Sequence, residues 1–573
     1  MDVYSTSAHS NGQFWGPTDE ETSSHCGHDS ILGGWSAMLD AQPLPPTPEL
    51  VARIPFFLEY YEKTICPSMV FIDGPNNPFR DHILPLTGSS RSLQHAICAL
   101  AACNLRMKRK LSLGQHGRDL ADAPEEGHLD DQSLAEEYQH RNLAIHLLNE
   151  QLNDPSQSRH DSVLATILML CHYRMAESGI AKFHTQFAGV KKILAMRRAS
   201  PFPPSRDSAW MEALFTYFDA ISASINDREA QLNTSFFGVM PDAQLLPLGA
   251  ENLVGCDRDL FKTISKLGRL NLLSQHRHVQ NLLSPASALS RGVASRSVSP
   301  LASPLASPLG HHQPYKPGHQ HHLSADAYAL PRFDMPSPGG GGGGGFATSP
   351  SAAPEGEDLL SPASAAAAAG AIPLCSGPPA YDDHRSTFWR EWKDARIALQ
   401  SWEFDPQRLL ASLQGPTMAT AAAAATGGQV RDLGSLSEAF RYAALLYTER
   451  LASPAVASAH NNFRNLVSQV VYYATSLEAG SAAEKFLLWP LFVAGSECVN
   501  ELQQNIVRSK CREIMARSGY LNNLTALDVL ERVWAGDMKP GGGPPTTPGM
   551  RRGPFNWTQC IGGPGVDMEW IMF

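Results

Sequence analysis

The chain has 573 residues, 43% of them hydrophobic and 18% charged, a composition typical of a folded globular protein with a large core. Its 46 Lys and Arg residues against 56 Asp and Glu residues give a formal net charge of −10. Basic residues occur in short runs, such as residues 108–110, so the sequence disfavours direct binding of DNA phosphates. The start of the chain lacks the pattern of a signal peptide. The most apolar run, residues 163–171, is about half the ~20 residues of a membrane span.

Ten cysteines are spread along the chain, and no two have a C-x-x-C spacing. Several lie inside apolar helical runs, which is how a protein in a reducing compartment uses cysteine as a small hydrophobic residue. We therefore predict no disulfides. His25, Cys26 and His28 stand close together, but a structural metal site needs four ligands and nothing nearby supplies the fourth. We interpret them as an exposed polar cluster and assign no metal ligands.

In chain order, residues 1–48 are rich in Ser, His, Gly and Pro and are predicted to be a disordered leader. Residues 49–283 form the first helical block. Its apolar spacing predicts a helix over residues 54–65, ended by Cys66-Pro67 and the turn-rich residues 73–78. A second helix follows, with Ser89 or Ser90 as its cap.

Three further helices are predicted in this block, over residues 134–152, 182–198 and 210–226. Between the first two, residues 163–171 are apolar on every side, so we expect a central core helix capped by Ser162. The helix over 182–198 should bury its aromatic and aliphatic residues. Its four basic residues are expected to face solvent: Lys191, Lys192, Arg197 and Arg198.

The tripeptide Asp227-Arg228-Glu229 closes the last of these helices. Three charges at a helix end can form an ion-pair network that locks adjacent helices together. Acid–base catalysis would need carboxylates that converge in a shared cleft, and the sequence gives no sign of such convergence. We predict the structural network.

Residues 284–384 change character, with repeated Ser-Pro steps, a glycine run at residues 339–345 and scattered histidines. So little apolar surface cannot offset the entropy of folding, and we predict a long disordered insertion. Exposed Ser-Pro steps are candidate targets of proline-directed kinases, each phosphate adding about −1.5 to −2 charges. Phosphopeptide mapping that finds none of these serines phosphorylated would contradict this hypothesis.

The second helical block covers residues 385–536, with helices expected to resume at Ser437 after an Ala/Gly segment. Further helices are predicted from Trp489-Pro490 and over residues 502–515 and 524–534. Residues 537–573 are a low-complexity tail that ends in VDMEWIMF, which alternates acids with large apolar groups. This acidic–aromatic end suits docking in a partner's groove, as transactivation segments do. Equally, it could fold back onto the helical body.

The order of several sequence pieces resembles the fungal-specific transcription factor domain. The pieces are YY at 60–61, CP at 66–67, IDGPNNPFR at 72–80, AICALAA at 96–102, LATILML at 164–170, AESG at 176–179, HTQFAG at 184–189, KKIL at 191–194, WMEALF at 210–215 and FLLWPLF at 486–492. The resemblance implies an all-α regulatory domain, here in two blocks interrupted by the insertion. It also implies a nuclear fungal transcription regulator.

This family usually places a zinc binuclear cluster, six cysteines beside basic residues, upstream of the domain. The leader holds only Cys26. We therefore expect the protein to reach DNA indirectly, or through a module encoded upstream of Met1. The expected partners are the transcription machinery or a zinc-cluster transcription factor, with a small-molecule effector between helices as a further option and no membrane.

The sequence has no G-x-S-x-G, no H-E-x-x-H and no Gly-rich loop between a strand and a helix. We accordingly predict no enzyme, no catalytic residues and no cofactor. Two alternatives to the transcription regulator stay open. One is a helical metabolite-binding or interaction scaffold, and the other is a module that pairs with a zinc-cluster protein and represses it.

Overall fold

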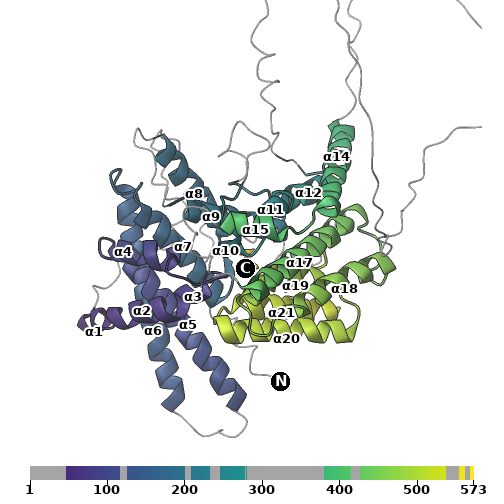
Figure 1. The fold of residues 1–573 in the computed structure, drawn as a ribbon. Helices are drawn as coiled ribbons and strands as arrows, with labels where there is room; N and C mark the ends of the chain where they lie inside the picture. The colour runs from purple at the N-terminus through teal and green to yellow at the C-terminus, as the bar shows by residue number, and fades with distance from the viewer. Residues whose placement is uncertain are drawn as a thin grey trace, which may run out of the picture. The chain divides into compact units, whose positions relative to one another are not determined.

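The structure is a computed structural model that describes residues 47–116, 125–199, 208–232, 245–277, 279, 380–413, 426–536, 554–561 and 568–573. Helices dominate these residues, and the strands among them are β1 (Ile180–Ala181) and β2 (Glu569–Trp570). The predicted all-α fold is confirmed (Figure 1).

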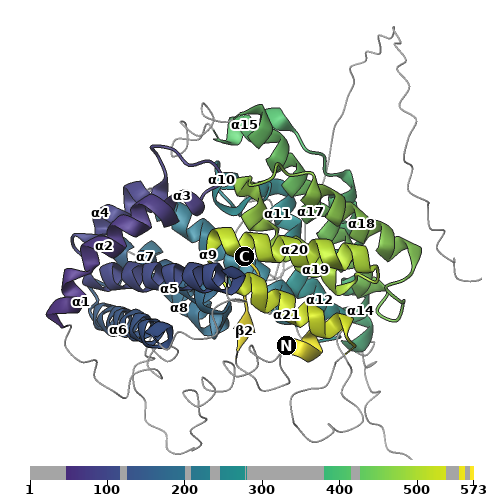
Figure 2. The same ribbon diagram turned by 90° about the horizontal axis from the view of Figure 1, so that it is seen from below.

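The first block contains short helices and turns before its long ones. In chain order, the helical elements of this block are α1 (Pro48–Ala52), α2 (Ile54–Tyr60), the π-helical turn η2 (Tyr61–Ile65), α3 (Cys66–Ser68), the π-helical turn η3 (Phe79–Ile83), α4 (Leu84–Thr87), α5 (Arg91–His116), α6 (Glu125–Asn153), α7 (Asp161–Glu177), α8 (Phe183–Arg198), α9 (Ala209–Ile225), α10 (Glu251–Val254), α11 (Arg258–Ile264) and α12 (Leu267–Ser274). Long helices α5 and α6 lie side by side, and α7 packs on α5 (Figure 2).

The second block is built in the same way. Its elements are α14 (Ala380–Ser401), α15 (Pro406–Leu413), α17 (Gly427–Ala452), α18 (Asn461–Thr475), the 3₁₀ helix η6 (Ala482–Leu487), α19 (Leu488–Ser496), α20 (Glu501–Ser518), α21 (Asn522–Trp534) and α22 (Thr558–Ile561). Helix α17 packs against α18 and α19, and α20 packs against α21.

The residues that the structure describes belong to one compact unit, which both helical blocks share. The predicted boundaries of the leader, the insertion and the two blocks stay predictions. The Ser-Pro steps of the insertion, the histidines there and the cluster at His25 lie outside the described residues.

The helix starts follow from side-chain caps, some of which the sequence prediction placed wrongly. Ser90 accepts from the amide of Leu93 and caps α5, as one of the two predicted candidates. Ser162 does not cap α7, because His160 occupies the cap position and its ring nitrogen accepts from the Ser162 amide at 3.3 Å. Helix α7 thus begins at Asp161, two residues before the apolar run.

Two further predictions about these helices are wrong. Arg197 does not face solvent, because it is buried beside α9 and pairs with Asp161 at 2.5 Å while donating to Ser208 at 2.8 Å. Helix α17 starts ten residues before Ser437, at Gly427. Its N-terminus is held by a capping box in which Thr426 and Gln429 bond reciprocally to each other's backbone.

The hydrophobic core runs continuously through both blocks. Residues 163–171 of α7 are all buried, which confirms the predicted central helix. Ser224 of α9 joins the blocks: its hydroxyl accepts from the indole of Trp489 at 2.9 Å, and its carbonyl accepts from Tyr447 at 2.7 Å. Such pairing lets polar atoms lie within an apolar core without the cost of unmade hydrogen bonds.

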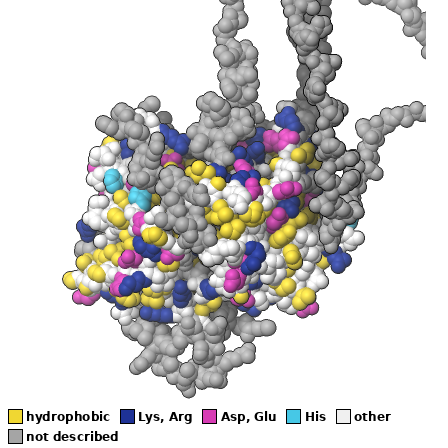
Figure 3. Space-filling model, viewed as in Figure 1, with side chains coloured by type: hydrophobic (Ala, Val, Ile, Leu, Met, Phe, Trp, Pro, Cys, Tyr) yellow, Lys and Arg dark blue, Asp and Glu magenta, His cyan; other side chains and the backbone are white. Residues whose placement is uncertain are grey.

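Eight of the cysteines are described, and all eight are buried free thiols. Burial raises the pKa of the Cys171 and Cys511 thiols to about 12, which makes them inert hydrophobic side chains. In the described part of the chain, no helix combines the length and the apolarity that crossing a bilayer requires. On the face shown in Figure 3, basic and acidic side chains are interspersed.

Candidate functional site

The acidic–aromatic residues 568–573, here called the tail segment, are packed into the helical body. Strand β2 pairs antiparallel with β1, so that Ile180 lies opposite Trp570 and Ala181 opposite Glu569. Next along the segment, the amide of Ile571 donates to the carbonyl of Gly179 at 3.0 Å. The structure therefore favours the folded-back alternative for the tail over a free one.

Two asparagines bind the backbone of the tail segment. Asn226, at the end of α9, accepts from the Trp570 amide at 2.8 Å and donates to the Trp570 carbonyl at 2.7 Å. Asn522, the first residue of α21, donates to the Phe573 carbonyl at 2.7 Å and to the Ile571 carbonyl at 3.4 Å. One amide comes from each block, so the segment ties the two blocks together.

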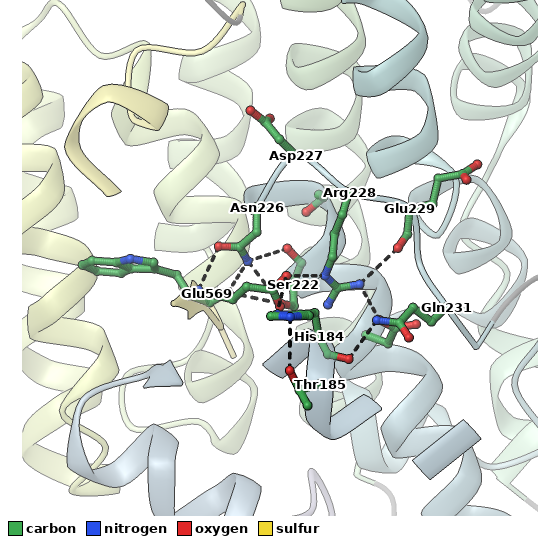
Figure 4. A network of polar contacts seen from close by, with 12 residues as sticks. His184, Thr185, Ser222, Asn226, Asp227, Arg228, Glu229, Gln231 and Glu569 are labelled. Carbon is green, nitrogen blue, oxygen red and sulfur yellow. Dashed lines mark hydrogen bonds and ion pairs between the residues drawn. The ribbon is translucent and has the colours of Figure 1, made fainter. Parts of the chain in front are cut away.

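Glu569 is the acidic anchor of the segment (Figure 4). Its side chain is only 10% exposed and accepts from Arg228 Nε at 2.7 Å and from the Ser222 hydroxyl at 3.4 Å. His184 Nδ1 of α8 lies 3.8 Å from the same carboxylate. These partners offset the hydration that the carboxylate loses on burial.

Arg228 is held in place by a second carboxylate. Its Nη1 contacts Asp219 of α9 at 2.6 Å, and Asp219 also accepts from the Leu232 amide at 2.7 Å. Burial alone would lower the pKa of Arg228, but Asp219 and Glu569 outweigh it and raise that pKa. The guanidinium is therefore a fixed positive charge that faces Glu569.

The ion-pair network predicted at residues 227–229 is confirmed. Asp227 turns the chain with a positive φ of 49° and accepts from Asn271 at 2.5 Å. Glu229 pairs with Arg269 of α12 at 2.8 Å, and Arg269 pairs with Glu391 of α14 at 3.0 Å. This chain of charges links α9 to helices of the first and second blocks.

Phe573 is the aromatic anchor at the other end of the segment. Its ring meets Phe218 at a centroid distance of 4.8 Å, Tyr217 at 5.5 Å, Phe486 at 5.7 Å and His172 at 6.4 Å, with tilted or edge-on geometry. Such aromatic pairs stabilise beyond their area of burial. Between the anchors, Ile571 and Met572 are buried.

We call the residues that contact the tail segment the tail site. They are His172, Gly179, Ile180, Ala181, His184, Tyr217, Phe218, Ser222, Asn226, Arg228, Phe486 and Asn522. The sequence placed Arg228 in an ion-pair network but gave none of the tail-site residues a role towards the tail. Asn226 and Trp570 are 344 residues apart in the chain, and no local pattern marks such a contact.

Among the residues that the structure describes, no group of three or more His, Cys, Asp or Glu side chains is placed to hold a metal ion. The tail site combines hydrogen bonds, an ion pair and an aromatic anchor around a chemically distinctive segment. Its parts recognise a peptide: they contact backbone amides and carbonyls, one carboxylate and one aromatic ring. The helical body therefore holds an extended segment of its own chain by strand pairing, an ion pair and an aromatic anchor.

The model of the fungal specific transcription factor domain matches residues 56–329 and 379–572, which is most of the chain. The protein belongs to this family and is a fungal transcription regulator. The second matched stretch includes the tail segment as far as Met572. No curated protein and no solved structure matches the chain.

Proposed function

We propose that this regulator acts in the nucleus through contacts with other proteins, and that the tail segment is one of its contact elements. The observation that carries the proposal is the packing of an acidic–aromatic segment against residues of both helical blocks. In this packed state the segment is masked. The body then controls how often the segment is available to the transcription machinery or to a zinc-cluster transcription factor.

The interactions that hold the tail segment are weak enough for its docking to be reversible. The segment is held by a two-residue β ladder, two asparagines, one ion pair and one aromatic anchor, and each hydrogen bond has a net value of about 0.5–1.5 kcal/mol. A sum of a few such terms, offset by the entropy of ordering the segment, gives a docked state that a binding event or a phosphate can shift. The carboxylate of Glu569 makes the balance sensitive to nearby charge.

A reporter assay tests the proposal, with the full chain fused to a heterologous DNA-binding domain. Asn226→Ala removes both hydrogen bonds to the Trp570 backbone, so we expect reporter output to rise several-fold. Adding Trp570→Ala and Phe573→Ala should return output to the basal level, because the released segment then lacks its aromatic groups. Asn505→Ala, at an exposed position of α20, is the matched control.

Two outcomes would count against this function. Unchanged output with Asn226→Ala, when the segment is shown to be released, would mean that the tail makes no activating contact. Output that stays raised in Asn226→Ala after deletion of residues 568–573 would show that another part of the chain makes the activating contact, and would favour the alternative in which the protein pairs with a zinc-cluster factor and represses it.

A further inference from the structure

The tail site offers groups whose partners come from the tail segment. The Oδ1 atom of Asn226 accepts from the Trp570 amide, and the carbonyl of Gly179 accepts from the Ile571 amide. Arg228 directs its Nε to Glu569, while its Nη1 is used by Asp219. The ring of Phe573 fills the space among the aromatic side chains of α9 and η6.

Withdrawal of the segment would break these hydrogen bonds and the ion pair, and would empty the aromatic pocket. An emptied aromatic pocket loses both dispersion contacts and apolar burial. The vacated state is therefore unfavourable unless something replaces the segment. A ligand that replaces it must supply the same chemistry: extended backbone for Asn226 and β1, a carboxylate for Arg228, and an aromatic ring four residues further on.

From this we infer that the tail site is a peptide-binding site, which exchanges residues 568–573 for an extended acidic–aromatic segment of a partner protein. The exchange rests on the function proposed above, since it names what releases the masked segment. Strand addition at β1 gives the peptide its affinity, and the two anchors give its specificity. The acid must stand at the β2 position that faces Arg228, and the ring at the position of Phe573.

The partner is a different protein rather than a second copy of this chain. A second copy already holds its own segment in its own site, so swapping segments between copies replaces each contact with an identical one. The swap gains no contacts and loses the entropy of association. A partner whose acidic–aromatic segment is free has no such contacts to break.

The test uses the full chain and a fluorescein-labelled peptide of sequence VDMEWIMF, measured by fluorescence anisotropy. Phe573→Ala weakens the chain's own segment and leaves the tail site intact. We expect this variant to bind the peptide at least ten-fold more tightly than the wild-type chain does. A peptide with Lys in place of its Glu, or Ala in place of its final Phe, should bind at least ten-fold more weakly.

A second pair of variants checks the location. In the Phe573→Ala background, Asn226→Ala should abolish peptide binding, whereas Asn505→Ala should leave it unchanged. The inference is wrong if the Phe573→Ala chain does not bind the peptide, or if it binds the Lys-substituted peptide equally well. A wild-type dimer that forms with rising concentration and is dissociated by the peptide would assign the site to a second copy and overturn the choice of partner.

If Phe573→Ala fails to fold, the wild-type chain still provides the test. A peptide with a photoreactive benzophenone in place of Trp should crosslink to residues of β1 and α9 when in excess, and unlabelled peptide should block this. No crosslinking at saturating peptide would contradict the exchange. Peptide binding together with an unchanged reporter would leave the exchange standing and refute the proposed function, so the two failures can be told apart.

Discussion

At the scale of single residues, the buried pair of Arg106 and Glu137 gives the clearest prediction. Glu137 is fully buried and binds Arg106 through two hydrogen bonds of 2.8 and 3.1 Å. Glu137→Gln would leave the guanidinium as an uncompensated buried charge, which costs roughly 3–5 kcal/mol in the free energy of unfolding. Urea denaturation measures this loss.

The exposed pair of Lys63 and Glu59 on neighbouring turns is the control. Glu59→Gln should leave the denaturation midpoint unchanged within error, because solvent screens exposed pairs. If Glu137→Gln and Glu59→Gln lowered the free energy of unfolding equally, the conclusion that Glu137 is buried and Glu59 exposed would be contradicted.

Buried histidines predict how stability depends on pH. Burial lowers the pKa of His140 to about 3, that of His95 to about 4 and that of His172 to about 3, and the first two share a hydrogen bond of 3.0 Å. Below the ordinary histidine pKa of about 6.5 the unfolded chain takes up protons that the folded chain does not. The free energy of unfolding should therefore fall as pH decreases from 6.5 towards 4.

The variant His172→Phe measures how much His172 contributes to this fall in the free energy of unfolding. Its stability should decline less steeply than that of the wild-type chain between pH 6.5 and 5, as measured by urea denaturation at each pH. Parallel curves would show that His172 is protonated in the folded state.

Gly179 carries a prediction about the tail site. Its φ is +78°, and a Cβ there would lie 2.5 Å from the Cβ of Asn522. Gly179→Ala combines backbone strain with this clash, so we expect a loss of about 1–3 kcal/mol in the free energy of unfolding. Gly74→Ala is the control, since nothing lies within 4 Å of its added methyl group. A neutral Gly179→Ala would mean that Gly179 is not packed against Asn522 of α21.

At the scale of elements, the start of α17 tests the capping box. Thr426→Ala removes the hydroxyl that accepts from the Gln429 amide at 3.2 Å, and the expected cost is about 1 kcal/mol. Thermal denaturation measures it. If the helix began at Ser437, as the sequence predicted, Thr426→Ala would leave the melting temperature unchanged.

The sequence predicted helices well where apolar residues recur at helical spacing, as in α8 and α9, or fill every face, as in α7. It failed at their starts because caps depend on a few side chains. At α7 the cap is His160 and not the expected Ser162. At α17 the capping pair Thr426 and Gln429 lies next to an Ala/Gly segment, where no helix start was predicted. Arg197 was misplaced because the partner that buries it, Asp161, lies on another helix.

At the scale of the whole molecule, the family and the two-block arrangement could be predicted from the order of the motifs. The tail site could not. Its asparagines and Gly179 have no chemical signature, and they meet the tail segment only because α7, α9 and α21 pack together. The sequence identified the tail's acidic–aromatic chemistry but left open whether the tail was free or packed.

Hydrogen exchange of residues 569–571 in the full chain tests the central claim that the tail segment is docked. The amides of Trp570 and Ile571 are bonded to Asn226 and Gly179, so we predict slow exchange in the wild-type chain. We predict fast exchange in Asn226→Ala, with the exchange of α7 unchanged. Fast exchange of both amides in the wild-type chain would contradict the docked segment and, with it, the proposed mask.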